Sequence, residues 1–473
     1  MPAILVAKTQ GINQALNTLY HRRGSVLASN RTDTIQQIRR QIHEKRSERQ
    51  ALIDRIWQQH PEYAALWHPR PLRANEIPLR ANEYLLAYEV TDTLTVAWLV
   101  HRGKVLKTKA IPVTRAALED LVHTYRDTLQ AVSLVDLERF NAQAGYRLYK
   151  LLLNAMLRQV PADRQLVIVP DEVLGQLPFE ALVSGPPRGS HLGQGPHGPF
   201  PRHVRYVGDT HVISYTPSAT TLAVLRRLKP PFIATKPMLI VADPIFDPSD
   251  TRLNPDKASS TIASRPLEPR VLNLLRTVES TGNQYLKRLP KTAAMANELS
   301  RMFGPDVTVL KGEQATTANL HKHPLSQYRY LVFATHGVFT HASQQRQEPF
   351  LVMSQVGNQE PEDGFLTLSD IMNLRLNAQV SALIAFDTGR GRYVHGEGVL
   401  GLGRAFQFVG SQSVLASLWS VAESATVQLT EHFFVRLKTG LTPQDALRQA
   451  RRDIRREGYE HPFYWASFIH ISV

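Results

Sequence analysis

Two apolar segments of the sequence end at residues that could do chemistry. The first, Tyr330–Thr335, runs into His336 and Gly337, and the second is Ser381–Phe386. Such apolar runs, rich in β-branched and aromatic residues, predict buried strands. The carboxyl ends of neighbouring parallel strands meet at one edge of a sheet, where binding and catalytic residues usually lie. A histidine there could act as general base for a nucleophile on the second strand.

The second strand leads into a polar turn, and its last residue carries no reactive atom. The turn reads Asp387-Thr388-Gly389, and glycine-containing turns can offer backbone N–H groups to an oxyanion. Phe386 stands where the nucleophile is expected. Thr388 could replace it only if a base activated its hydroxyl, and Asp387 is more simply an exposed turn acid than a cation ligand. Without a nucleophile, we expect His336 to cap its turn through ring hydrogen bonds.

Two further motifs predict structure rather than ligand binding. His321 and His323 lie in a polar stretch without evident partner carboxylates, which indicates solvated surface and no metal site. The segment GEGVLGLGRAF, from Gly396, lacks the lysine of a phosphate-binding loop and the spacing of a dinucleotide fingerprint. We therefore expect no cofactor, and a helix whose glycines allow close packing under the site.

The candidate residues need a mostly parallel sheet to position them. From residue 166 onward, strand-like runs alternate with helical stretches, which predicts an α/β fold with helices on both faces of the sheet. The clearest strands are expected at 166–170, 238–242, 330–335, 381–386, 413–419 and 463–471. The glycine- and proline-rich segment 184–201 is expected to lack regular structure.

A helical and β-meander region is expected before this fold. Residues 31–58 carry Ile and Leu at helical spacing, which predicts a long amphipathic helix. Three strands of an antiparallel meander are predicted at 84–90, 94–101 and 105–112. Two helices are predicted to follow at 114–131 and 136–159. We therefore divide the chain into a helical segment with a linker (1–82), a meander with helices (83–160) and an α/β domain (161–473).

Composition narrows the function classes. The 473 residues include no cysteine, which excludes disulfides, thiolate metal sites and a cysteine nucleophile. No apolar stretch approaches the ~20 residues of a membrane span, and the N-terminus lacks the pattern of a signal peptide. We therefore expect a cytoplasmic protein with no membrane partner.

The chain is basic, with a net charge of +14. Residues 1–60 contribute to this excess, and a second cluster comprises Arg448, Arg451, Arg452, Arg455 and Arg456. Such patches can attract nucleic acid or an acidic partner. Because no nucleic-acid motif accompanies the charge, a solvated basic face is the favoured interpretation.

Several segments occur together, and in this order, in one known family. These are LVIVPDEVLGQLPFEAL (166–182), FATHG (333–337), AFDTGRG (385–391), GEGVLGLGRAFQFVG (396–410) and HPFYWASFI (461–469). With the segments between them, they resemble the CHAT domain, a caspase-related family often found behind tetratricopeptide repeats. The resemblance covers most of the chain.

The resemblance implies a caspase-like three-layer sandwich with a histidine–cysteine dyad. The family's nucleophile motif reads SAC, one residue, then TG, so the cysteine position falls on Phe386. His336 and Phe386 are then the vestigial dyad positions. The vestigial oxyanion turn comprises Gly337, Asp387, Thr388 and Gly389.

These observations favour a catalytically inactive CHAT-domain protein that serves as a scaffold or regulatory subunit of a complex. A tetratricopeptide-repeat protein or an active CHAT subunit is an expected partner, because only about thirty residues precede the long helix. The vestigial groove could also hold a peptide. The alternatives are an active peptidase with a nucleophile such as Thr388, or a basic nucleic-acid-associated module.

Overall fold

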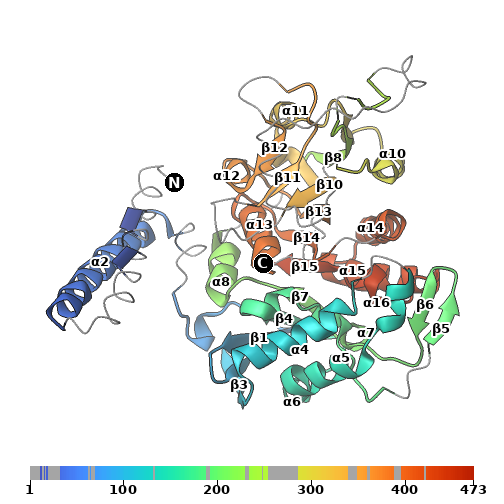
Figure 1. Ribbon diagram of the computed structural model, residues 1–473. Coiled ribbons are helices and arrows are strands. Elements are labelled where there is room, and N and C mark those ends of the chain that lie inside the picture. The colour runs from blue at the N-terminus through green and yellow to red at the C-terminus, as the bar shows by residue number, and fades with distance from the viewer. Residues whose placement is uncertain are drawn as a thin grey trace.

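The computed structural model describes residues 11–12, 15, 18–19, 32–61, 64, 70–130, 134–187, 192–228, 234–247, 249–253, 286–338, 349–358, 363–387, 396–419 and 422–473. At residues 32–35, 39, 134, 228, 338, 385–387 and 396–400 it describes the backbone alone. The described residues form a large mixed sheet with helices on both faces (Figure 1).

The sheet begins at one edge with β12 and ends at the other with β3, in the order β12-β11-β10-β13-β14-β15-β7-β4-β1-β2-β3. β8 pairs with β10, and β9 pairs with β8. The pairings β8–β10, β10–β13, β13–β14, β4–β7 and β1–β4 are parallel. The strands are β1 Glu83–Val90, β2 Thr95–His101, β3 Lys104–Ile111, β4 Gln165–Val169, β7 Val212–Tyr215, β8 Lys236–Pro244, β9 Thr308–Gly312, β10 Tyr328–Val338, β11 Phe350–Val352, β12 Phe365–Thr367, β13 Val380–Asp387, β14 Ser413–Ser417 and β15 Phe468–Ser472.

Helices cover the two faces and complete the three layers that the sequence predicts. α10 packs on β8 and α14, and α15 packs on α14, β7 and β15, whereas α13 packs on β14 from the opposite face (Figure 1). The helices are α2 Thr32–Gln59, α4 Arg115–Asp127, α5 Ala142–Leu148, α6 Asn154–Leu157, α7 Val207–Thr210, α8 Ala219–Leu228, α10 Pro290–Phe303, α11 Thr317–His321, α12 Leu368–Ile371, α13 Gly396–Phe408, α14 Glu423–Lys438, α15 Pro443–Arg456 and α16 Pro462–Trp465.

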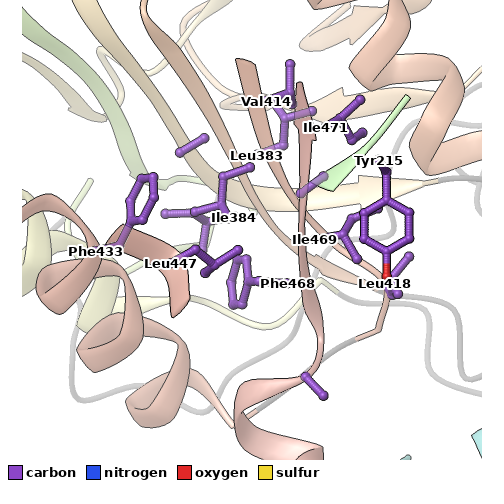
Figure 2. Close-up of a cluster of buried hydrophobic side chains, with 14 of the residues drawn as sticks. Tyr215, Leu383, Ile384, Val414, Leu418, Phe433, Leu447, Phe468, Ile469 and Ile471 are labelled. Atoms are coloured by element: carbon purple, nitrogen blue, oxygen red, sulfur yellow. The ribbon is translucent and has the colours of Figure 1, made fainter. Parts of the chain in front are cut away.

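The core lies on both sides of the central strands, because successive side chains of a strand point to opposite faces. Figure 2 shows Ile384 and Phe468 beside Phe433 of α14, and Ile471 near Tyr215 of β7. All five side chains are almost fully buried. The strand interiors at the centre of the sheet are therefore fixed by packing on both faces.

The predicted meander is confirmed and continues the main sheet. β1, β2 and β3 pair antiparallel in sequence order, and β1 also pairs in parallel with β4. The carboxylate of Glu83, which is fully buried at the start of β1, accepts two hydrogen bonds from Arg226 of α8, at 2.6 and 2.8 Å. This ion pair joins the meander to a helix that lies more than a hundred residues later in the chain.

The prediction that 184–201 lacks regular structure is wrong. Two short strands, β5 Leu192–Gly195 and β6 Gly198–Pro201, pair antiparallel in this segment. Gly198 adopts φ +102°, which suits glycine in a tight turn. At Gly193 an added Cβ would lie 2.5 Å from the Phe200 ring, so the missing side chain lets the strands approach closely. The glycines that indicated a loop are therefore what the hairpin requires.

The strand predicted at 463–471 is correct only in its second half. Residues 462–465 form the short helix α16, and β15 begins at Phe468. The His461 side chain caps α16 by accepting a hydrogen bond from the Phe463 N–H at 3.0 Å. Pro462 occupies the first helical turn, where its fixed φ favours a helix. Because α16 and β15 both contain aromatic side chains, composition alone did not show that a helix precedes the strand.

The long helix predicted at 31–58 is confirmed as α2, and it buries a small cluster of its own. Ile38, Ile42, Leu52 and Ile56 pack together in a cluster separate from the main core, and α2 lies at the left of Figure 1. In the described parts of the chain, no helix has the length and apolar character needed to cross a membrane.

Candidate functional site

The two strands singled out in the sequence are neighbours, and their ends are in register. β10 and β13 pair in parallel, with His336 opposite Phe386 and Gly337 opposite Asp387. Neighbouring strands lie about 4.8 Å apart, so the backbones of the two vestigial dyad positions are adjacent. The prediction that these positions meet at one sheet edge is therefore confirmed at the level of the backbone. Thr388 and Gly389 of the predicted turn lie outside the described residues.

His336 is buried, and its ring is held in one orientation. The side chain is 5% exposed, and its Nε2 lies 2.7 Å from the carbonyl oxygen of Lys287. A carbonyl oxygen can only accept, so this contact requires the proton on Nε2, and in the neutral ring Nδ1 is then an acceptor. The ring also packs against Phe246, with centroids 5.0 Å apart. These contacts fix the imidazole and tie β10 to the chain at Lys287.

The hydroxyl of Thr335, the residue before His336, is engaged within the sheet. Thr335 is fully buried, and its hydroxyl donates a hydrogen bond to the carbonyl oxygen of Val352. Because side chains alternate along a strand, Thr335 and His336 point to opposite faces of β10. The threonine hydroxyl therefore belongs to the sheet interior.

An ion cluster borders the site and was not found in the sequence. Asp243 ends the regular part of β8, next to β10, and its side chain is 4% exposed. Its carboxylate lies 2.8 Å from Arg252 and 3.0 Å from Arg288. The hydrogen bonds from Arg288 to Asp243 raise the pKa of the Arg288 guanidinium above its usual value. Asp243 follows an apolar strand just as His336 does, so the same sequence signal could have identified it.

Residues 286–289 join this ion cluster to the histidine. Lys287 supplies the carbonyl oxygen bound to His336, and Arg288, the next residue, binds Asp243. The carboxyl edge of three adjacent parallel strands thus holds Asp243, His336 and Phe386 in that order. No local pattern could have predicted this contact, because Arg288 lies 45 residues from Asp243 in the chain.

The glycine-rich segment forms a helix, α13, as predicted. An added Cβ at Gly403 would lie 2.3 Å from Cδ1 of Ile471 in β15, so glycine allows this helix to approach the sheet. At Gly401 an added Cβ would meet nothing within 4 Å. The close-packing role therefore applies to Gly403 and does not extend to Gly401. Among the described residues, no group of three His, Asp or Glu side chains is placed to hold a metal ion.

The basic cluster of α15 is largely engaged within the fold. Arg451 is buried, and its guanidinium binds the carboxylate of Glu180 and the carbonyl oxygens of Trp465 and Phe468. Arg448 binds Asp163 at 2.5 Å. Arg451 is therefore a core residue and does not belong to an exposed basic face.

Comparisons with known proteins place these features in a family. The CHAT domain profile matches residues 142–472. Tetratricopeptide repeat protein 28 from Mus musculus and from Homo sapiens are each 33% identical to this chain over 108 residues, which are 23% of the chain. The match spans 4% of the length of these relatives.

Two solved structures also align with the chain. The separase–securin complex of Saccharomyces cerevisiae matches over 88% of this chain and 31% of that chain, with a TM-score of 0.45 and 10% identity. The Arg-specific cysteine proteinase gingipain R matches over 76% of this chain and 74% of that chain, with a TM-score of 0.37 and 9% identity. Because the profile covers most of the sequence from the helices before β4 to the last strand, the chain belongs to the CHAT domain family.

Proposed function

We propose that this protein is a catalytically inactive member of the CHAT domain family that acts by binding other proteins, as a scaffold or regulatory subunit. The observation that carries the proposal is the register of β10 and β13, which sets Phe386 beside His336. Phenylalanine has no nucleophilic atom and no titratable proton. In enzymes that depend on a coupled nucleophile and base, loss of the nucleophile costs on the order of 10⁶-fold in rate.

The buried polar residues around Phe386 at the sheet edge support a binding role. His336 has a fixed ring orientation, and Asp243 on the neighbouring strand binds two arginines, although no cysteine exists anywhere in the chain. A frame that serves only stability has little need for a buried histidine and a buried aspartate at the sheet edge, since burying ionisable groups is costly. We infer that this edge presents a shaped surface to a protein or peptide.

The partners proposed are a tetratricopeptide-repeat protein or an active CHAT subunit. The curated relatives are named as tetratricopeptide repeat proteins, and the match to them covers 4% of their length. In those proteins the matching segment is thus one part of a much longer chain. A separate protein could supply the corresponding repeats to this chain.

The proposal is tested by incubating the purified protein with a proteome-derived peptide mixture and mass-spectrometric detection of new termini. Wild type and His336→Ala are expected to give the same termini as the buffer blank. Cleavage by wild type that disappears in His336→Ala would overturn the proposal and favour a substitute nucleophile such as Thr388. Thr388→Ala in the wild-type background then separates that hydroxyl from a contaminating protease.

A further inference from the structure

The end of α15 carries arginines that line an open hollow of ≈ 430 Å³. Its lining consists of Arg452, Arg455, Arg456 and Glu460. Successive like charges on one helix face repel each other, so such a cluster is unfavourable unless something offsets it. Along the chain, the residues of this hollow are far from His336. The hollow does not depend on chemistry at the strand edge that carries His336.

Arg455, one of the lining residues, has several contacts within the fold. Its guanidinium lies over the rings of Tyr206 and Trp465, at 5.3 and 5.1 Å from their centroids. One of its nitrogens donates to the Asp209 carboxylate at 2.6 Å. A guanidinium fixed in this way presents its remaining N–H groups without further loss of side-chain freedom.

The charges of Arg452 and Arg456 are less fully compensated by carboxylates than that of Arg455. Within the described part of the chain, Arg452 has no ion pair with a carboxylate, and it donates a hydrogen bond of 2.7 Å to the backbone carbonyl of Asp209. Burial, and then the nearby Arg448, lower the pKa of Arg452 below its usual value. Arg456 is 77% exposed and lies 3.7 Å from Asp453, a carboxylate already bound by Arg436 at 2.7 Å. Among the described residues, Arg452 therefore has no carboxylate partner, and Arg456 shares Asp453 with Arg436.

A second hollow of ≈ 190 Å³ borders the same short helix, α7. Val207 and Thr210 of α7 contribute to its lining, whereas Asp209 of α7 binds the arginines of the first hollow. Tyr149, which begins a π-helical turn, Asn154, which follows that turn, and Arg158 add hydrogen-bond donors. π-helical turns often occur at functional sites. The donors on both sides of α7 suit an extended ligand better than a single ion.

The arrangement does not suit nucleic acid. Single strands are bound through aromatic faces that stack on bases, but Tyr206 and Trp465 are each 2% exposed and lie under Arg455. Binding to a duplex uses a track of separate phosphate contacts, whereas these arginines converge on one hollow that also contains Glu460.

We propose that the hollow formed by Arg452, Arg455 and Arg456 is the docking site for an acidic peptide segment of a partner protein. The carboxylates of its glutamate and aspartate side chains bind the guanidiniums that line the hollow. The segment continues past α7 toward Arg158. Charge-assisted hydrogen bonds to planar guanidiniums supply both affinity and orientation.

The test measures fluorescence anisotropy of labelled peptides with the full chain at physiological salt. The probes are a peptide with six glutamates, its glutamine counterpart and a form with one phosphoserine. The variants are Arg456→Gln, which touches little else, and Arg452→Gln/Arg456→Gln. Arg301→Gln is the matched control, because Arg301 is 79% exposed and paired with Glu298 on α10.

The glutamate peptide is expected to bind saturably and the glutamine peptide not to bind. The double variant should weaken binding about ten-fold or more, and Arg301→Gln less than two-fold. Much tighter binding of the phosphoserine form than of the glutamate peptide would overturn the assignment of a carboxylate as the bound group. The proposal is overturned by equal loss in Arg301→Gln, by absence of saturable binding, or by duplex DNA or anionic vesicles competing in the same arginine-dependent way.

Discussion

At the scale of single residues, a phenylalanine at position 386 determines which chemistry is open to His336 on the adjacent strand. His336 has its proton fixed on Nε2 by the Lys287 carbonyl, which leaves Nδ1 as the acceptor. Beside a thiol this acceptor would be a general base, but opposite Phe386 it has no proton to take from that residue. The same imidazole then stabilises the fold through its hydrogen bond to the Lys287 carbonyl and its ring contact with Phe246.

A second buried histidine makes the stability of the protein depend on pH. His461 is 1% exposed, caps α16 and packs edge-on against Phe140, with centroids 5.4 Å apart. Burial lowers the pKa of His461 to about 3, whereas in the unfolded chain it is about 6.5. Above pH 6.5 the ring is neutral in both states. Between these values the unfolded chain binds a proton that the folded chain does not, so the free energy of unfolding falls as the pH falls.

We predict that His461→Asn removes this part of the pH dependence. Asparagine keeps an acceptor for the Phe463 N–H but does not titrate. From pH 6.5 to 5, wild type should lose on the order of 2 kcal/mol more of its free energy of unfolding than the variant does. Urea unfolding at several pH values measures this difference. Parallel curves for the two proteins would show that His461 is not the group responsible.

At the scale of elements, the packing of α13 on β15 depends on one glycine. Gly403→Ala places a methyl group 2.3 Å from Cδ1 of the fully buried Ile471. Overpacking of this kind typically costs about 1–3 kcal/mol. We expect the urea midpoint of Gly403→Ala to fall accordingly, and Gly403→Ala/Ile471→Val, which lacks that Cδ1, to recover part of the loss.

Gly401→Ala is the matched control on the same helix, because its added Cβ meets nothing within 4 Å. It should leave stability unchanged or raise it by up to about 1 kcal/mol, since alanine is the better helix former. Equal destabilisation by the two alanines would show that contact with Ile471 of β15 is not what makes Gly403→Ala unfavourable.

At the scale of the whole molecule, the sheet brings distant segments to one edge. Asp243, His336 and Phe386 come from three strands that are adjacent in space but separated by long stretches of chain. Toward the other end of the sheet, the ion pair between Glu83 of β1 and Arg226 joins the meander to α8. The division into a helical segment, a meander and an α/β domain remains a prediction, although β1 and β4 share one sheet.

The sequence could predict what is encoded locally. The strands that end at His336 and Phe386 were predictable because each is a continuous apolar run, and parallel order then placed their ends together. The β5–β6 hairpin was missed because its glycines also suit a loop. The Arg288–Asp243 and Arg451–Glu180 pairs were missed because each joins residues far apart in the chain. Charge alone could not distinguish the buried Arg451 from the exposed Arg456.

The central claim is that Phe386 occupies the nucleophile position of a frame that still positions His336. Phe386→Cys tests this directly, because the chain has no cysteine and the introduced thiol is therefore its sole one. The measurement is the rate of alkylation by iodoacetamide as a function of pH, which reports the pKa of the thiol. Phe386→Cys/His336→Ala is the control.

We predict that the thiol in Phe386→Cys has a pKa well below the ordinary value of about 8.5, because the adjacent imidazole stabilises the thiolate. Removing the imidazole in Phe386→Cys/His336→Ala should return the pKa toward 8.5. A thiol whose pKa is the same with and without His336 would contradict the account, since the two positions would then not form a dyad frame.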